Sequence, residues 1–231
     1  GYSVEWRVIN AADYGRSQRR RRVFFFVFRN DTKYAKSLDN KYENEDIVFE
    51  EHKYDDYLFQ TGLFATQFPI KQAPVKNRQV FYELEDDIVA VSDNFTGTVW
   101  NTGVMRHGKY YSIETAANFD GNPITLGEIL QDETEVPDKY FLTDKAKLEK
   151  FQYLRGPKKL ERTSADGHTY IYSEGGMSPY DDLNLPGRTM LTSEGTVNRS
   201  THFLFVNNKY RLLTPIEAER LQDFPDDWTA Y

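Results

Sequence analysis

The sequence predicts a mixed α/β protein in which β-structure predominates. Aromatic residues make up 15% of the 231 residues, with 16 Tyr and 16 Phe, and these side chains favour strands. From 62 to 120, short apolar segments alternate with Gly, Asn and Pro, which is typical of short strands in a twisted antiparallel sheet. Helix-start signals in the second half of the chain supply the α-component.

The first two strands are predicted on either side of an arginine-rich loop. Residues 4–9 alternate between apolar and charged side chains, which predicts a strand, and Asp13-Tyr14-Gly15 is a turn signal. Residues 23–28 form a continuous apolar run, typical of a strand buried on both faces. Both strands are so apolar that we expect them to need neighbours from outside the chain.

The middle of the chain is predicted to leave this hairpin and then to form short strands. Residues 30–60 are polar and acidic, which indicates a surface excursion. Strands are expected at 79–82, 98–100 and 110–113.

The second half combines helices with loops rich in Gly, Ser and Asn. Capping signals predict helices at 125–130, from Thr143 or Asp144 to about Tyr153, and from Thr214-Pro215 to about Gln222. Residues 163–187 and 193–201 are expected to be exposed loops, and strands are predicted at 188–192 and 202–206.

Composition excludes several kinds of chemistry. The sequence has no Cys, which excludes disulfides, thiolate metal sites and a cysteine nucleophile on these residues. The four His residues lie far apart and lack metal-ligand spacing, so no metal site is predicted. No apolar run approaches the roughly 20 residues that cross a bilayer.

Charge is distributed unevenly in a chain whose formal net charge is −7. Seven arginines face two acids in residues 5–29, and seven Lys or Arg face two acids in residues 145–162. Eight acids face two lysines in residues 39–60. Five of the seven residues from Arg16 to Arg22 are arginine, and such closely spaced cations predict an anionic or electron-rich partner.

Three segments resemble the C-terminal part of the DNA (cytosine-5)-methyltransferases. Residues 9–23, which contain Gln18-Arg19-Arg20-Arg21-Arg22, are similar to the Gln-x-Arg-x-Arg motif of that family and its flanks. Residues 186–195 resemble its penultimate motif, and residues 210–225 resemble the start of its last motif. The three segments occur in the order of the family, while residues 30–185 correspond to it only by position.

The resemblance implies a domain organisation. Residues 1–29 would be the last strands of a Rossmann-like catalytic sheet, residues 30–208 a mixed, β-rich target-recognition domain, and residues 209–231 a helix returning to the catalytic domain. The fold expected from the resemblance is therefore a fragment of a methyltransferase sheet plus a recognition domain. It also implies a cytoplasmic, nucleoid-associated bacterial protein that modifies DNA, often beside a restriction endonuclease.

The resemblance also assigns catalytic roles. Family members turn a cytosine out of the duplex, add a cysteine thiolate to C6 and methylate C5 from S-adenosylmethionine. Arg22 would contact O2 of the extruded base, and Gln18 and Arg20 would support that pocket. The cofactor-binding turn and the nucleophile loop have no counterpart here. The chain alone is therefore expected to bind no cofactor and to be inactive without an N-terminal catalytic half, on the same polypeptide or on another subunit.

Double-stranded DNA is the expected partner, and two loops that flank the penultimate motif would read it. The predicted DNA-contacting residues are Arg188, Thr189, Thr192, Ser193, Asn198, Arg199, Arg162 and Tyr180. Three alternatives stay open: the target-recognition subunit of a naturally split methyltransferase, a DNA-binding module without catalytic function, and a generic β-rich interaction domain.

Overall fold

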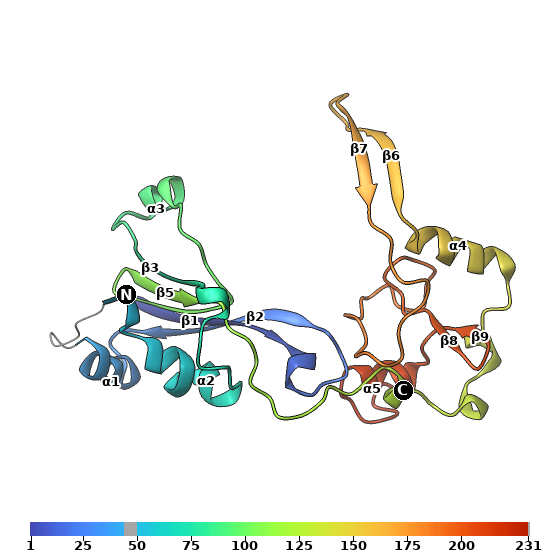
Figure 1. Ribbon diagram of the computed structural model, residues 1–231, viewed down its shortest axis with the longest axis horizontal. Helices are drawn as coiled ribbons and strands as arrows, with labels where there is room; N and C mark the ends of the chain where they lie inside the picture. Colours follow the sequence, from blue (N-terminus) through green and yellow to red (C-terminus); the bar gives the residue numbers. More distant parts are fainter. Residues whose placement is uncertain (44–49, 231) are drawn as a thin grey trace. The chain divides into compact units, whose positions relative to one another are not determined.

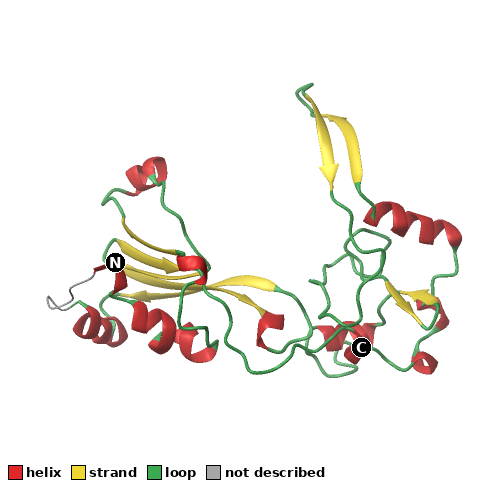
Figure 2. Ribbon diagram, viewed as in Figure 1, coloured by secondary structure: helices red, strands yellow, loops and turns green. Residues whose placement is uncertain are grey.

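The computed structural model describes residues 1–43 and 50–230, and the chain forms two compact units. The first unit comprises residues 1–14 and 21–121, and the second comprises residues 15–20 and 122–231. Both are mixed α/β, and the strands of every named sheet are antiparallel (Figure 2). The units divide the chain differently from the predicted ranges 1–29, 30–208 and 209–231, which stay a prediction about a complete enzyme.

A five-stranded sheet organises the first unit, with the strand order β2-β1-β4-β5-β3 (Figure 1). The hairpin predicted at 4–28 forms as β1 and β2, and β4 pairs with the other edge of β1. The chain therefore supplies part of the pairing that we expected from outside. Its strands and helices are β1 (Tyr2–Asn10), β2 (Arg21–Arg29), α1 (Lys33–Tyr42), α2 (Leu63–Gln67), β3 (Gln79–Glu83), α3 (Ile88–Asn94), β4 (Thr102–Arg106) and β5 (Lys109–Ile113).

The charged face of β1 is buried more completely than its apolar face. Glu5 accepts hydrogen bonds from the Tyr57 hydroxyl (2.9 Å) and from the backbone N–H of Phe64 (3.2 Å) at the start of α2. Arg7 donates to the carbonyl of Leu58 at 3.1 Å. Burial raises the pKa of the Glu5 carboxyl, although these hydrogen bonds oppose the shift. Alternation thus located the strand, whereas the helical segments of the unit decide which face is buried.

The acidic segment at 30–60 is a core element, which corrects the prediction of a surface excursion; its residues 44–49 lie outside the described part. Tyr42, Tyr54 and Tyr57 are at most 4% exposed and pack beneath the sheet. Their hydroxyls need acceptors once they are buried, and nearby carboxylates provide them. The Tyr54 hydroxyl donates to Glu43 at 2.6 Å, and the Tyr42 hydroxyl donates to Asp56 at 2.7 Å.

The apolar run of β2 is exposed, which corrects the prediction of a strand buried on both faces. Phe25 and Val27 are 64% and 54% exposed, and Val23 beside them is 49% exposed. The reason is topological: β2 is the edge strand, and α1 covers only the face that carries Phe26 and Phe28. The uncovered face with Val23, Phe25 and Val27 is called the β2 apolar face below.

In its described residues, the second unit has two small sheets and two α-helices. Its strands and helices are α4 (Lys145–Arg155), β6 (Lys158–Thr163), β7 (Thr169–Glu174), β8 (Leu204–Val206), β9 (Lys209–Arg211) and α5 (Pro215–Leu221). One core cluster joins Leu126, Leu204 and Leu221, and another stacks Phe151 on Phe203 with ring centroids 4.4 Å apart.

Most predicted elements form, and several predictions are wrong. The helices capped by Asp144 and Thr214 and the strands near 79–82, 110–113 and 202–206 form close to the expected positions. The segments 98–100 and 188–192 are not strands, the helix at 125–130 is only a 3₁₀ turn at 127–129, and strand β7 lies inside the loop expected at 163–187. No helix in the described residues has the length and hydropathy to span a membrane.

Candidate functional site

The arginine-bearing loop is bound to the segment that resembles the penultimate motif. In the second unit, the Gly187 N–H donates to the Ser17 carbonyl at 2.7 Å, and the Arg19 N–H donates to the Gly187 carbonyl at 2.8 Å. The Thr189 hydroxyl donates to the Arg19 carbonyl at 2.8 Å. These bonds form a short parallel bridge between residues that are about 170 positions apart.

The same loop also contacts the end of α5. The Ser17 hydroxyl and the Gln18 side-chain amide each donate to the Leu221 carbonyl at 3.1 Å. A helix leaves its last carbonyls without intrahelical partners, and this contact satisfies one of them. Gly187 permits the close approach, because a Cβ there would lie 2.6 Å from the Leu221 Cδ1 atom. Three segments that are distant in sequence therefore meet at Gln18, Gly187 and Leu221.

The three predicted active-site residues occupy different environments. Gln18 is 3% exposed, and its Oε1 lies 3.5 Å from Nη1 of the half-buried Arg20. Arg22 is the second residue of β2 in the first unit, lies opposite Ile9 and is exposed. Its Nη1 donates to the Arg21 carbonyl at 2.6 Å, and no carboxylate of the described residues lies within 4.0 Å of its guanidinium. Arg22 thus keeps free donors for a ligand.

Arg188 forms an internal ion pair, and its predicted contact with DNA stays a prediction. Its Nε donates to Asp181 at 2.6 Å, and its Nη2 donates to the Thr201 carbonyl at 3.0 Å. The same Asp181 accepts from Arg155 at 2.7 Å and from the Phe203 N–H at 2.8 Å. Arg188 therefore braces the second unit.

Asp181 is ionised despite its burial. Burial alone raises the pKa of this carboxyl, but the hydrogen bond and charge of Arg188, the charge of Arg155 and the Phe203 N–H outweigh it and hold the pKa at about 2. Two arginines and one carboxylate leave a net positive charge at this point. We call Arg155, Asp181 and Arg188 the Asp181 cluster.

Side-chain hydrogen bonds stabilise the loop at 193–201, which was predicted to contact DNA bases. Asn198 accepts from the N–H groups of Ser200 and Thr201 and donates to the Ser193 carbonyl at 3.0 Å. Arg199 donates to the Leu154 carbonyl at 2.6 Å and pairs with Glu174. The polar groups of Asn198 and Arg199 thus bond within the second unit, and their predicted contacts with DNA stay a prediction.

The remaining candidates are more accessible. Thr192 is exposed, while Ser193 is partly buried and provides a carbonyl that holds the loop together. Tyr180 is 39% exposed and packs on Phe205 with ring centroids 5.4 Å apart. Arg162 lies on β6, is exposed, and stacks over the Tyr172 ring at 3.9 Å.

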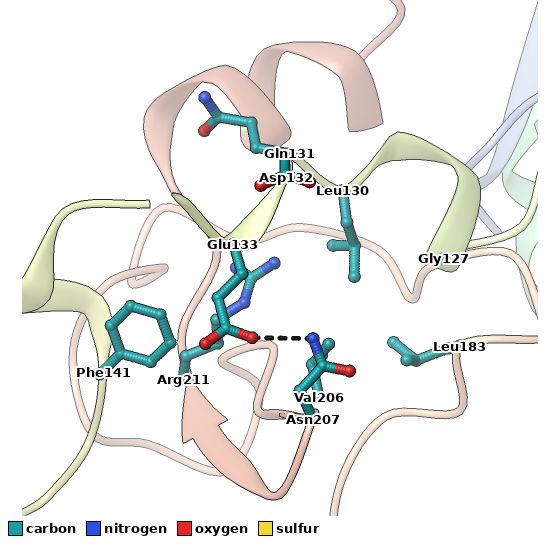
Figure 3. Close-up of a pocket in the computed structure, with 10 residues that line it drawn as sticks. All are labelled: Gly127, Leu130, Gln131, Asp132, Glu133, Phe141, Leu183, Val206, Asn207 and Arg211. Carbon is teal, nitrogen blue, oxygen red and sulfur yellow. Dashed lines mark hydrogen bonds between the residues drawn. The ribbon is translucent and has the colours of Figure 1, made fainter. Parts of the chain in front are cut away.

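A cavity of about 430 Å³ opens beside β8 and β9 (Figure 3). Arg211, the cation of its lining, is already paired, because it forms two 2.7 Å bonds with Glu217. Glu133 of the lining accepts from Asn207 at 2.7 Å. The cavity thus offers no free cation for a carboxylate or a phosphate. We assign no residue of this chain to S-adenosylmethionine.

Sequence reasoning missed Asp181, Arg155 and Ser17. Asp181 and Arg155 bond across 26 positions, and no local pattern reports such a pair. Ser17 precedes the recognised motif directly, and its hydroxyl would have been a reasonable candidate for a capping contact to a helix end. His202 was also missed as a buried partner of Glu194, whose Oε2 lies 3.0 Å from its Nδ1.

Comparison with known proteins identifies the class to which this arrangement belongs. The family model of the C-5 cytosine-specific DNA methylases matches residues 1–231, and the chain therefore belongs to that family. The Type II methyltransferase M.Sau3AI of Staphylococcus aureus is 51% identical over 229 residues, which are 99% of this chain and 52% of that protein. The chain thus spans about half the length of this relative. No solved structure was found to match the chain.

Proposed function

We propose that this chain is the C-terminal part of a DNA cytosine-5 methyltransferase, with target recognition in the second unit and an active-site arginine in the first. The observation that carries the proposal is the meeting of Gln18, Gly187 and Leu221. Each belongs to a different segment that resembles the family, and their contacts are buried hydrogen bonds and a close glycine packing. Such convergence is expected of a functional unit and not of three chance matches.

Arg22 is the proposed catalytic residue. A guanidinium stays charged under partial desolvation and offers a planar set of donors. Placed at O2 of an extruded cytosine, it would hold the base and offset charge that develops on the ring. Gln18 and Arg20 are the proposed supports of the pocket. The nucleophilic cysteine and the cofactor site would come from outside these 231 residues, which contain no Cys.

The β2 apolar face is the proposed contact with that missing catalytic part. It exposes Phe25 and Val27 on an edge strand, so both apolar side chains and unpaired backbone groups are available there. The relative from S. aureus is about twice as long as the aligned region, which supports the existence of a segment to cover it. The relative is a Type II enzyme, and by analogy we propose a restriction-modification role in a bacterial cytoplasm.

Complementation tests the proposal. The chain alone should transfer no labelled methyl group from S-adenosylmethionine to DNA, and mixing it with the part of the S. aureus relative outside the matched region should restore transfer. Turnover by the chain alone would contradict the proposal. A DNA-binding module would bind DNA with a steep salt dependence but gain no activity, and a generic interaction domain would show no such DNA affinity.

The role of Arg22 has its own test in the complemented enzyme. Arg22→Ala should lower turnover roughly 100-fold or more, as expected when a donor at a developing charge is lost, while duplex binding changes much less. Arg21→Ala is the matched control, because Arg21 is also exposed but lies on the opposite face of β2. Equal losses of turnover and binding for Arg22→Ala would indicate a backbone contact instead.

A further inference from the structure

The hairpin of β6 and β7 is a two-stranded ribbon that projects from the rest of the second unit (Figure 1). Both of its faces are open, because all residues of the two strands are exposed except Lys158, Tyr172 and Glu174, which are partly buried. An isolated hairpin of this size is marginally stable in water. Because the faces of the ribbon are open, its side chains are available to bind another molecule, and such binding would stabilise it.

The register of the ribbon separates its side chains into two faces. Leu160 pairs with Tyr172 and Arg162 pairs with Tyr170, so these four share one face. Glu161 and Ile171 lie on the other face. The face with Arg162 thus combines this cation with two tyrosine rings, and the Lys158–Glu174 ion pair closes the same face at the base of the ribbon. Glu161, the carboxylate nearest to Arg162 in sequence, lies on the other face.

Arg162 is held in place without being neutralised. Its guanidinium carbon lies 3.9 Å from the centroid of the Tyr172 ring, a stacking contact that restricts the side chain but leaves its N–H edge open. In the described residues no carboxylate lies within 4.0 Å of it, in contrast to Arg188 and Arg199. Among the arginines predicted to contact DNA, Arg162 therefore has the most accessible donors.

The surroundings of the ribbon favour a polyanion. Lys147 and Lys150 on α4 and Lys159 on β6 are exposed and likewise lack a carboxylate within 4.0 Å in the part of the chain that the structure describes. The major groove of B-DNA, about 12 Å wide, admits a two-stranded ribbon. The guanidinium fork matches the O6 and N7 acceptors of guanine in that groove.

We propose that the β6–β7 ribbon enters the major groove of the target duplex and that Arg162, positioned by Tyr172, reads a guanine there. The inference rests on the proposed function and deepens it, because it assigns sequence reading to this ribbon, whose strand β7 lies within the predicted loop at 163–187. Lys159 on the opposite face would contact phosphate, which adds affinity without sequence preference.

Selection from a random duplex library with the purified chain tests the inference. The wild-type chain should enrich a defined sequence, and Arg162→Ala should still bind DNA but lose preference at one guanine by about 5- to 150-fold. Replacing that guanine by 7-deazaguanine, which lacks N7, should weaken binding by the wild-type chain and leave Arg162→Ala unaffected. Lys159→Ala, the matched control, should weaken binding to all sequences alike.

Two variants of Tyr172 test whether its ring positions Arg162 for guanine recognition. Tyr172→Ala should reduce the guanine preference, whereas Tyr172→Phe, which keeps the ring, should retain it. If Arg162→Ala selects the same sequence with unchanged preference, the inference is wrong while the proposed function stands. If the wild-type chain shows no salt-dependent DNA binding, both are wrong.

Discussion

Asp181 shows at the scale of a single residue how the second unit is held together. Its carboxylate accepts from Arg188, Arg155 and the Phe203 N–H, so it links the penultimate motif, the end of α4 and the segment before β8. A buried arginine is tolerated only when a carboxylate or carbonyls receive its protons. Removing Asp181 would leave Arg155, which is 1% exposed, without its only carboxylate partner in the described residues.

Substitution of Asp181 by Asn should therefore destabilise the second unit strongly. We expect a loss of about 3 kcal/mol in its free energy of unfolding, as is usual when one partner of a buried ion pair is removed. Asp31→Asn is the matched control, because the Arg29–Asp31 pair is exposed and should contribute less than about 1 kcal/mol. Urea unfolding followed by hydrogen exchange would measure each loss in its own unit, in peptides from 145–213 for Asp181→Asn and from 21–43 for Asp31→Asn. Equal losses would contradict the cluster's role.

The same residue predicts an acid sensitivity with a definite sign. The pKa of Asp181 is lowered to about 2 in the folded chain, so folding favours its ionised form. Its contribution, roughly 2 kcal/mol, is complete above about pH 4 and is lost as the pH falls toward 2. The loss of stability of the second unit over this interval should be smaller in Asp181→Asn than in the wild type. An identical pH dependence of the two proteins would show that the carboxyl is not preferentially ionised.

At the scale of elements, the starts of the helices could be predicted from capping residues, whereas the buried face of each strand could not. The helix at Pro215–Leu221 begins where Thr214, Pro215 and Glu217 predicted it, and both halves of the capping box form. For α4, Asp144 and not Thr143 is the N-cap, a choice that the sequence left open. The face of β1 that becomes buried and the exposure of β2 depend on which segments pack against them, and no local pattern contains that information.

The capping box of α5 should contribute measurably to the stability of the second unit, although α5 is only seven residues long. Thr214→Ala removes the hydroxyl that accepts the Glu217 N–H at 3.2 Å, and we expect a cost of about 1 kcal/mol or more to the second unit. Thr143→Ala, outside the cap of α4, should change stability by no more than about 0.5 kcal/mol. Chemical denaturation of both variants compares them directly, and a Thr214→Ala protein as stable as the control would refute the assignment.

At the scale of the whole molecule, motifs predicted the family and the structure shows which of their residues are free to act. The sequence signals for Gln18, Gly187 and the Thr214 helix come from segments that do meet. The DNA-contacting candidates were less predictable, because an arginine's sequence position does not reveal its partner. Arg188 and Arg199 form ion pairs with Asp181 and Glu174, whereas Arg162 has no carboxylate within 4.0 Å in the described residues.

The β2 apolar face leads to the last prediction, which concerns association. An exposed, apolar edge strand pairs readily with another chain, so the isolated chain should self-associate as its concentration rises. The double variant Phe25→Lys/Val27→Lys should weaken this association at least about tenfold, or roughly 1.4 kcal/mol, and should also prevent complementation by the missing catalytic part. Ile88→Lys is the control, because Ile88 is 81% exposed on α3 of the same unit but lies outside the sheet. Sedimentation velocity gives the association constants, and a double variant that associates and complements like the wild type would show that this face is not the contact with the catalytic part.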